Sequence, residues 1–183
     1  MANIRVWTKQ SSAILDALEQ SGVHRAKKQH VLKNEDSKML MEAYDWLAKS
    51  LPNQSFRPEG ADYPVWLSFS HEAAMLPTPG TVMLELEVDE EMVARVNIAK
   101  WSAILNFTYI PKNEKDKRRH ASLLEDYGTS DVRAFMTPFY PQIKREILES
   151  WPRLFDESID LGGPLCYGNI WEIRKEWIIS ITQ

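Results

Sequence analysis

The sequence predicts a single α+β domain over residues 1–183, with a mixed or antiparallel sheet. Segments with β-type and helical patterns alternate irregularly, without the repeating period of a parallel βαβ fold. A length of 183 residues suits one domain and is enough to bury a self-sufficient core. Hydrophobic residues make up 44% and charged residues 26%, which disfavours disorder and a disulfide scaffold.

The N-terminal region predicts a strand followed by two helices. Ile4–Thr8 is a short apolar and β-branched run, which is typical of a strand. Ser11 or Ser12 can cap the next helix, whose apolar residues recur at helical spacing up to a stop at Gly22. A second helix is expected to start after Asp36 or Ser37 and to end before the proline at position 52.

The middle of the chain predicts two strands and a further helix. Val65–Ser70 is a candidate strand, and a Pro-Thr-Pro-Gly turn follows it at residues 77–80. Thr81–Val88 is the clearest strand, because apolar and more polar residues alternate along it and predict one buried and one wetter face. Asn97 can cap the next helix, which carries an apolar stripe that includes Trp101.

The C-terminal region predicts two helices and two closing strands. Lys112–His120 is charged and is expected to run into a polar helix, whereas Pro141 suits the first turn of an amphipathic helix. Tyr167–Ile173 and Trp177–Ile181 are the two candidate strands, and a Gly-Gly-Pro break at 162–164 precedes them.

The composition also limits the compartment and the broad class of partner. The formal charge is −4, with 22 basic and 26 acidic residues, so no overall basic excess indicates a nucleic-acid binder. Cys166 is the sole cysteine, which excludes an intramolecular disulfide and fits a reducing cytosol. No signal peptide or membrane-spanning stretch is visible, so we expect a cytoplasmic protein without membrane association.

The histidines and the cysteine do not predict a metal site. The four histidines share no metal-ligand spacing, and we therefore expect no metal; they are His24, His30, His71 and His120. Cys166 lies in an apolar strand candidate, where a buried structural thiol is the more common role than a nucleophile. Neither a phosphate-binding glycine loop nor a Gly-x-Ser-x-Gly motif occurs.

A basic stretch leaves two interpretations open. Two acids interrupt this stretch. Its cations are Lys112, Lys115, Lys117, Arg118 and Arg119. A solvated helix face is the more common explanation of such a run. The alternative is a patch that follows the phosphates of RNA, with Tyr109 and Tyr127 nearby for base stacking.

Motifs along nearly the whole chain resemble an uncharacterised bacterial and phage family, a domain of unknown function. Its members open on an Ile-Trp-Thr-x-Gln strand and carry a Tyr-Pro-x-Trp segment, a Trp-x-x-x-Leu-Asn-x-x-Tyr helix and a Trp-rich tail. The matching segments are Val6–Gln10, Tyr63–Trp66, Trp101–Tyr109, Ser150–Asp156 and Trp171–Trp177.

A second resemblance is to ADP-ribosyltransferase-like proteins, and it implies bound NAD between two small split sheets. It rests on a strand ending in Thr, a capped helix, Gly22, a Phe-Ser-x-Glu-Ala segment and an acidic amphipathic strand. In that family an Arg or His of the first strand holds the nucleotide. Here Trp7 and Thr8 occupy that motif, and Arg5 lies two residues earlier on the same strand face.

The same resemblance implies roles for three further residues. Ser70 and His71 belong to the second motif, where a hydroxyl steadies the nicotinamide ribose, and Glu172 is the candidate for the catalytic acid. Breaking the nicotinamide–ribose bond develops oxocarbenium character, which a fixed carboxylate in a dry cleft stabilises. The implied reaction transfers ADP-ribose to a protein or nucleic-acid acceptor.

Structural explanations of these residues remain open beside the enzymatic one. Ser70 can simply start a helix as its N-cap, and Glu172 can be an exposed acid paired with Arg174 or Lys175. Trp7 is more often a core residue than a cofactor platform. The alternative function is therefore a non-enzymatic interaction module, a phage- or defence-associated binder, with RNA binding as a third hypothesis.

Overall fold

The computed structural model describes residues 2–28 and 35–183 of the chain. Internal contacts divide the chain into two compact units: unit 1 comprises Met1–Arg95 and Cys166–Gln183, and unit 2 comprises Val96–Leu165. Helices and several small antiparallel sheets make up the structure, which confirms the predicted α+β class. Within the described ranges, no helix is both long and apolar enough to cross a membrane.

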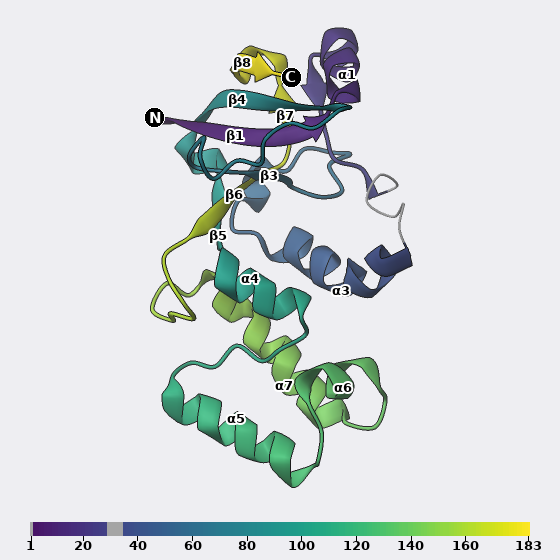
Figure 1. The fold of residues 1–183 in the computed structure, drawn as a ribbon, viewed down its shortest axis with the longest axis vertical. Helices are drawn as coiled ribbons and strands as arrows, with labels where there is room; N and C mark the ends of the chain where they lie inside the picture. The colour runs from purple at the N-terminus through teal and green to yellow at the C-terminus, as the bar shows by residue number, and fades with distance from the viewer. Residues whose placement is uncertain (1, 29–34) are drawn as a thin grey trace. The chain divides into compact units, whose positions relative to one another are not determined.

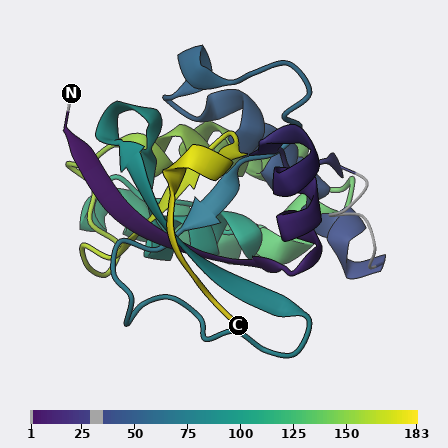
Figure 2. The same ribbon diagram turned by 90° about the horizontal axis from the view of Figure 1, so that it is seen from above.

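The first sheet of unit 1 has the order β1-β4-β8 and is antiparallel throughout. Its strands are β1 (Asn3–Ser11), β4 (Thr81–Asp89) and β8 (Ile178–Thr182). Figures 1 and 2 both show β1 running alongside β4. The inward positions of these two strands are buried, as the alternation of β4 predicted, and they form much of the core of unit 1. Met83 is an exception, because it lies on the other face of β4 and is also buried.

A second three-stranded sheet and a short strand pair complete unit 1. The sheet has the order β3-β6-β5, with β3 (Val65–Leu67), β6 (Cys166–Ile170) and β5 (Ala94–Asn97), and the pair joins β2 (Val23–His24) to β7 (Ile173–Arg174). An isolated antiparallel bridge between Trp7 and Ser68 connects β1 to the end of β3. The two three-stranded sheets are thereby joined at one point.

The described helices of unit 1 end where the sequence predicts. Helix α1 (Ala13–Ser21) stops at Gly22, whose φ of 72° is left-handed and suits glycine. Ser12 occupies the N-cap position of α1, but its side chain makes no capping hydrogen bond. Helix α3 (Glu35–Ser50) starts slightly earlier than predicted and ends before Pro52.

Unit 2 is helical, and polar caps start most of its helices. Asn97, Asn113 and Ser130 each accept a backbone N–H at the N-terminus of their helix, while Pro141 opens the last one. The helices are α4 (Ile98–Leu105), α5 (Glu114–Asp126), α6 (Asp131–Met136) and α7 (Pro141–Ser150). Short 3₁₀ helices occur in both units, at η1 (Gln54–Phe56), η2 (Glu90–Met92), η3 (Trp151–Phe155) and η4 (Lys175–Trp177).

Several elements differ from their predicted extent. The segment predicted as one strand, Tyr167–Ile173, is two strands, because the chain bends at Trp171–Glu172 between β6 and β7. The strand predicted at Val65–Ser70 ends at Leu67 and passes into a turn. Strands β2 and β5 and helix α6 have no counterpart in the prediction, because each is too short to show a periodic pattern.

Candidate functional site

The Trp7–Ser68 bridge brings two predicted site segments together in unit 1. Each residue donates its backbone N–H to the carbonyl of the other, with N–O distances of 2.9 and 2.7 Å. The chain then turns back so that the His71 ring meets Trp7 edge to face, with ring centroids 6.4 Å apart. Trp7 and His71 therefore share a surface, and Ser70 precedes His71 in the same turn.

The predicted residues of β1 point to opposite faces of the strand. Arg5 and Trp7 lie on the outer face, whereas Thr8 is buried on the inner face and donates its hydroxyl to the Trp66 carbonyl at 2.8 Å. Gln10 donates to the same hydroxyl oxygen. Thr8 thus has protein partners for its polar atom, and its side chain does not face the surface that Trp7 and His71 share.

Ser70 starts a turn rather than a helix. Its hydroxyl oxygen accepts the backbone N–H of Ala73 at 3.2 Å, in the manner of a capping residue, but residues 70–74 do not continue into a helix. His71 and Glu72 in this turn are exposed, so the turn is open to solvent on the side of His71.

Glu172 is a buried carboxylate held by two arginines. One oxygen accepts from Arg25 Nε at 2.9 Å and the other from Arg174 Nε at 2.8 Å, while the Glu172 side chain is only 5% exposed. The register of β2 on β7 pairs His24 with Ile173 and so places Arg25 across from Glu172. Burial acts to raise the pKa of Glu172, but the hydrogen bonds and charges of Arg174 and Arg25 outweigh it and lower that pKa.

The register of the second sheet separates Glu172 from Ser70. Antiparallel pairing joins Val65 to Ile170 and Leu67 to Gly168, so Glu172 follows one end of the β3–β6 ladder. Ser70 follows β3 at the opposite end. The structure therefore places Glu172 elsewhere in unit 1, away from the bridge. The other five predicted residues lie in the two segments that the bridge joins, and they are Arg5, Trp7, Thr8, Ser70 and His71. The predicted pairing of Glu172 with Arg174 is present, although the acid is buried rather than exposed.

A second carboxylate, Glu85, lies beside Trp7. Glu85 is directly opposite Trp7 in the β1–β4 register and therefore shares the outer face of the sheet with Arg5 and Trp7. Its carboxylate accepts the Ser180 hydroxyl at 2.8 Å and lies 3.5 Å from the Arg5 guanidinium. The alternation of β4 assigned Glu85 to the wetter face, but its pairing with Trp7 of β1 is not visible in the sequence.

The outer edge of β1 offers peptide groups next to the bridge. Trp7 directs its N–H and C=O away from β4 toward Ser68, so Arg5 and Lys9 direct theirs to the same side by strand alternation. Within the described residues, neither Arg5 nor Lys9 has a backbone hydrogen-bond partner on that side. This edge can therefore hydrogen-bond a ligand that carries an amide.

Unit 2 contains a polar cluster around a buried histidine. His120 is 4% exposed and its ring stacks on Tyr109, with centroids 4.0 Å apart and planes 11° apart. Its Nε2 lies 2.6 Å from Asp131 Oδ1 and its Nδ1 lies 3.4 Å from Glu146 Oε2. Asp131 also accepts the backbone N–H of Tyr109 at 3.0 Å. The sequence indicated Tyr109 as part of a family motif and as a neighbour of the basic stretch, and His120 as one of four histidines, at the end of that stretch, but it did not indicate that the two rings stack.

The Tyr109 hydroxyl connects this histidine to an ion-pair network. It donates to Asp116 at 2.9 Å and accepts from Arg119 Nη2 at 3.1 Å. Arg119 also pairs with Glu146, at 2.9 Å, and Arg153 pairs with Asp116 at 3.3 Å. Burial acts to raise the pKa of Asp116, but hydrogen bonds from the Lys112 backbone, Tyr109 and Arg119 lower it to about 2.

We expect Asp116→Asn to lower the free energy of unfolding by about 2 kcal/mol at pH 7, because a carboxyl with pKa about 2 in the folded state titrates near 3.9 when unfolded. A lowered folded-state pKa contributes stability above the unfolded pKa, and the contribution is lost as the pH falls toward 2. Urea unfolding at pH 7 and pH 2.5 measures the difference. Exposed Asp126→Asn on the same helix is the control, and an equal loss at both pH values would contradict the assignment.

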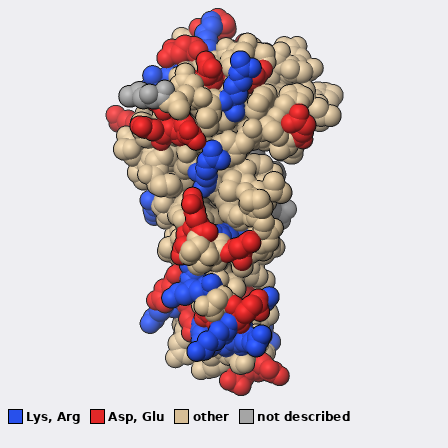
Figure 3. All heavy atoms as spheres, turned by 90° about the vertical axis from the view of Figure 1, so that its left-hand side faces the viewer, with Lys and Arg blue, Asp and Glu red and all other residues tan. Residues whose placement is uncertain are grey.

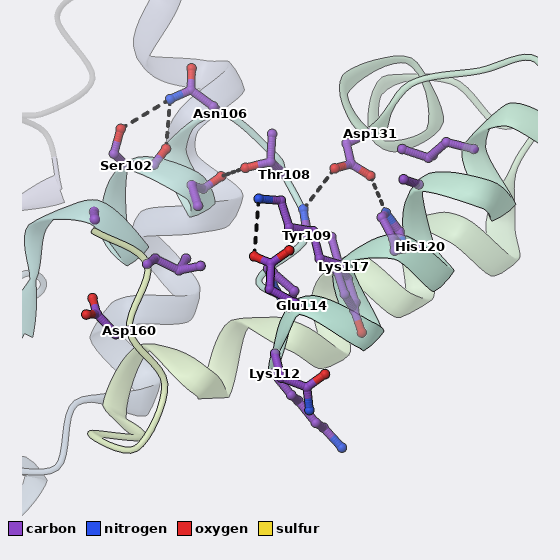
Figure 4. Close-up of a pocket in the computed structure, with 17 residues that line it drawn as sticks. Ser102, Asn106, Thr108, Tyr109, Lys112, Glu114, Lys117, His120, Asp131 and Asp160 are labelled. Atoms are coloured by element: carbon purple, nitrogen blue, oxygen red, sulfur yellow. Dashed lines mark hydrogen bonds and ion pairs between the residues drawn. The ribbon is translucent and has the colours of Figure 1, made fainter. Parts of the chain in front are cut away.

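A groove of about 970 Å³ lies between α4, α5 and the loops of unit 2. Its volume is within the range of small-molecule sites. Figure 4 shows Tyr109 and His120 next to one another in its wall, with Asp131 bonded to both. Its lining mixes alanine and leucine side chains with polar groups such as Ser102, Asn106 and Thr108.

The basic stretch is partly neutralised in the structure. Lys117 lies 3.6 Å from Glu114, and Arg119 pairs with Asp116 and Glu146. Lys112, Lys115 and Arg118 are exposed. On the face drawn in Figure 3, basic and acidic side chains are interspersed. The RNA-binding hypothesis for this stretch stays a prediction, without a continuous basic field to support it on that face.

The described residues hold no group of three or more side chains with metal-ligand geometry. His30 lies outside the described residues. Cys166 is half-buried at the start of β6.

The family described as "Domain of unknown function (DUF3841)" matches residues 5–179, so the chain belongs to this family. The match confirms the predicted membership in an uncharacterised domain family. The chain matches no curated protein and no solved structure.

Proposed function

For this member of the DUF3841 family, we propose that unit 1 binds NAD and acts as an ADP-ribosyltransferase-like domain. The observation that supports it best is the Trp7–Ser68 bridge, which joins two split sheets and sets the Trp7 and His71 rings edge to face. The proposed site is the outer face of β1 and β4 beside this bridge, with Arg5, Trp7, His71 and Glu85 as its side chains.

Each group of the proposed site has a matching part of the dinucleotide. Arg5 is exposed and its weak contact with Glu85, at 3.5 Å, leaves it able to bind the pyrophosphate. The Trp7 and His71 rings offer packing surfaces for a flat base. A nicotinamide carboxamide has one C=O and one NH₂, which match the N–H and C=O that Arg5 or Lys9 directs to the edge of β1.

The proposed chemistry needs one fixed carboxylate near the nicotinamide ribose. The C–N bond breaks and its electron pair leaves with nicotinamide, and a nucleophile of the acceptor then bonds to the ribose carbon and releases its proton to water. A carboxylate stabilises the positive sugar between these events. We assign this role to Glu85 in preference to Glu172, because Glu85 lies opposite Trp7, whereas two arginines offset the charge of Glu172.

The test is calorimetric titration with NAD together with a chromatographic assay of nicotinamide release. We expect the unmodified chain to bind NAD, and Trp7→Ala to weaken binding about tenfold or more, since an aromatic packing contact contributes about 0.5–1.5 kcal/mol beyond its buried area. Glu85→Gln should slow nicotinamide release about 100-fold while NAD affinity changes little, as expected for a group that acts on the transition state.

Two matched variants make the test specific. Exposed Glu91→Gln is the control for a lost surface charge. Glu172→Gln distinguishes the two acids, and its folding is checked by circular dichroism at the assay temperature. If Glu172→Gln abolishes release in a folded protein while Glu85→Gln does not, the catalytic acid is Glu172. Absence of binding at about 2 mM NAD would reject the proposal.

A non-enzymatic interaction module is the second candidate, and one observation favours it. The polar atoms of Thr8, Ser70 and Glu172 already have protein partners, so these three side chains need no ligand. The Trp7 and His71 rings, which meet edge to face next to an exposed turn, would then form the contact surface for a partner protein. Loss of partner binding on replacing Trp7 by alanine, in a chain that does not bind NAD, would support this function.

A further inference from the structure

His120 connects three helices of unit 2 through two carboxylates. The histidine lies on α5, Asp131 is the first residue of α6 and Glu146 lies on α7. The two ring nitrogens approach one carboxylate each, at 2.6 Å for Asp131 and 3.4 Å for Glu146. Because the His120 side chain is only 5% exposed, solvent has little access to replace either contact.

Only one protonation state of the ring satisfies both contacts. A neutral imidazole donates from one nitrogen and accepts at the other, whereas the imidazolium donates from both. A carboxylate is an acceptor and cannot donate to a bare ring nitrogen. In the neutral form, Nε2 keeps its proton because its contact with Asp131 is the shorter one. The lone pair on Nδ1 then faces Glu146 Oε2, and no hydrogen bond joins these two atoms.

The other charged and titratable groups around the ring hold the rest of the cluster in place. Tyr109 covers one face of the ring, and its hydroxyl binds Asp116 and Arg119 of α5. Arg153 of η3 lies with its guanidinium carbon 4.9 Å from the centre of the Tyr109 ring. Arg119 binds Glu146 at 2.9 Å independently of His120, so Glu146 has a second position available when its contact with the histidine is lost.

We propose that His120 is a proton-operated clasp, which joins α5 to both α6 and α7 when protonated and gives up its own contact with α7 when neutral, so that Arg119 alone then pairs α5 with Glu146. Loss of the proton leaves Asp131 bound to His120 and shifts Glu146 fully to Arg119, which is 48% exposed on the surface of α5. The first consequence is weaker attachment of α7 to α5. The second consequence is a pH-dependent change in the wall of the groove, because His120 and Asp131 both line it.

Hydrogen exchange followed by NMR tests the clasp on the full chain. The ring signals of His120 are titrated between pH 5 and pH 8.5, and exchange rates of the α7 amides at residues 143–150 are compared at pH 5.5 and pH 8. After correction for the intrinsic base-catalysed rate, we expect the α7 amides to open about tenfold more often at pH 8, because one charge-assisted hydrogen bond is lost.

Glu146→Gln is the decisive variant. A glutamine amide can donate to the neutral ring, so in this variant the difference between the two pH values should fall below about twofold. His71→Gln, which changes an exposed histidine of unit 1, is the control and should leave the α7 difference unchanged. A His120 ring that does not titrate in this range, or an equal pH response in Glu146→Gln, would overturn the proposal.

Discussion

Trp151→Ala is expected to lower the free energy of unfolding by about 3–5 kcal/mol, the range measured for removing a large aromatic side chain from a core. Trp151 is 0% exposed at the junction of α7 and η3. Its ring stacks on Phe135, with centroids 5.7 Å apart, and Phe135 stacks in turn on Phe107 at 4.5 Å. Removing the indole therefore leaves a cavity in the centre of the aromatic core of unit 2.

Urea unfolding followed by far-ultraviolet circular dichroism measures this loss. Tyr127→Ala is the control, because it removes an aromatic ring of unit 2 that is 50% exposed. We expect the control to cost less than about 1 kcal/mol, since surface substitutions have small effects. Similar losses in both variants would show that Trp151 is not the centre of this core.

Glu172→Ala is expected to cost about 2–3 kcal/mol at pH 7. Removing one partner of a buried ion pair costs about 3–5 kcal/mol when the remaining charge stays buried, and the partial exposure of both arginines reduces that value. The folded-state pKa of Glu172 is lowered, so its contribution is present above the unfolded value of about 4.3 and is lost as the pH falls below it. The difference between variant and parent should therefore shrink at acid pH.

Thermal unfolding of both proteins at pH 7 and at about pH 3 tests this expectation. Glu176→Gln is a suitable control, because Glu176 is an exposed acid that contacts Arg174 at 3.8 Å. The control should change the melting temperature little at either pH. A Glu172→Ala variant as stable as the parent at pH 7 would mean that the two ion pairs contribute no net stability.

The parts of the fold that could be predicted are those that local patterns determine. The alternation along Thr81–Val88 predicted β4 because its side chains face a buried and a wetter side in turn. Gly22 and Asn97 mark helix boundaries that could be predicted, because each depends only on neighbouring residues. Gly22 ends α1 in a left-handed conformation, and the Asn97 side chain accepts a backbone N–H from the first turn of α4. The bend at Trp171–Glu172 could not be predicted, because it is set by pairing of the next residues with β2, which is distant in the chain.

The candidate sites depend still more on distant pairing. Arg25, the second arginine partner of Glu172, has no signal in the sequence: the two residues are 147 positions apart, and only the β2–β7 register places them together. Glu85 was visible as a residue of the wetter face, but its position beside Trp7 follows from the β1–β4 register. The cluster around His120 unites three helices whose packing has no short-range signal.

Strands β5 and β6, through which the chain leaves and re-enters unit 1, are neighbours in one sheet. Unit 2 is therefore inserted between two adjacent strands. During synthesis on the ribosome, residues 96–165 emerge before β6, β7 and β8, which supply Ile170 and Ile173 to the core of unit 1. The inserted helices can thus fold first, and the N-terminal strands must wait for the last segment of the chain before their own core is complete.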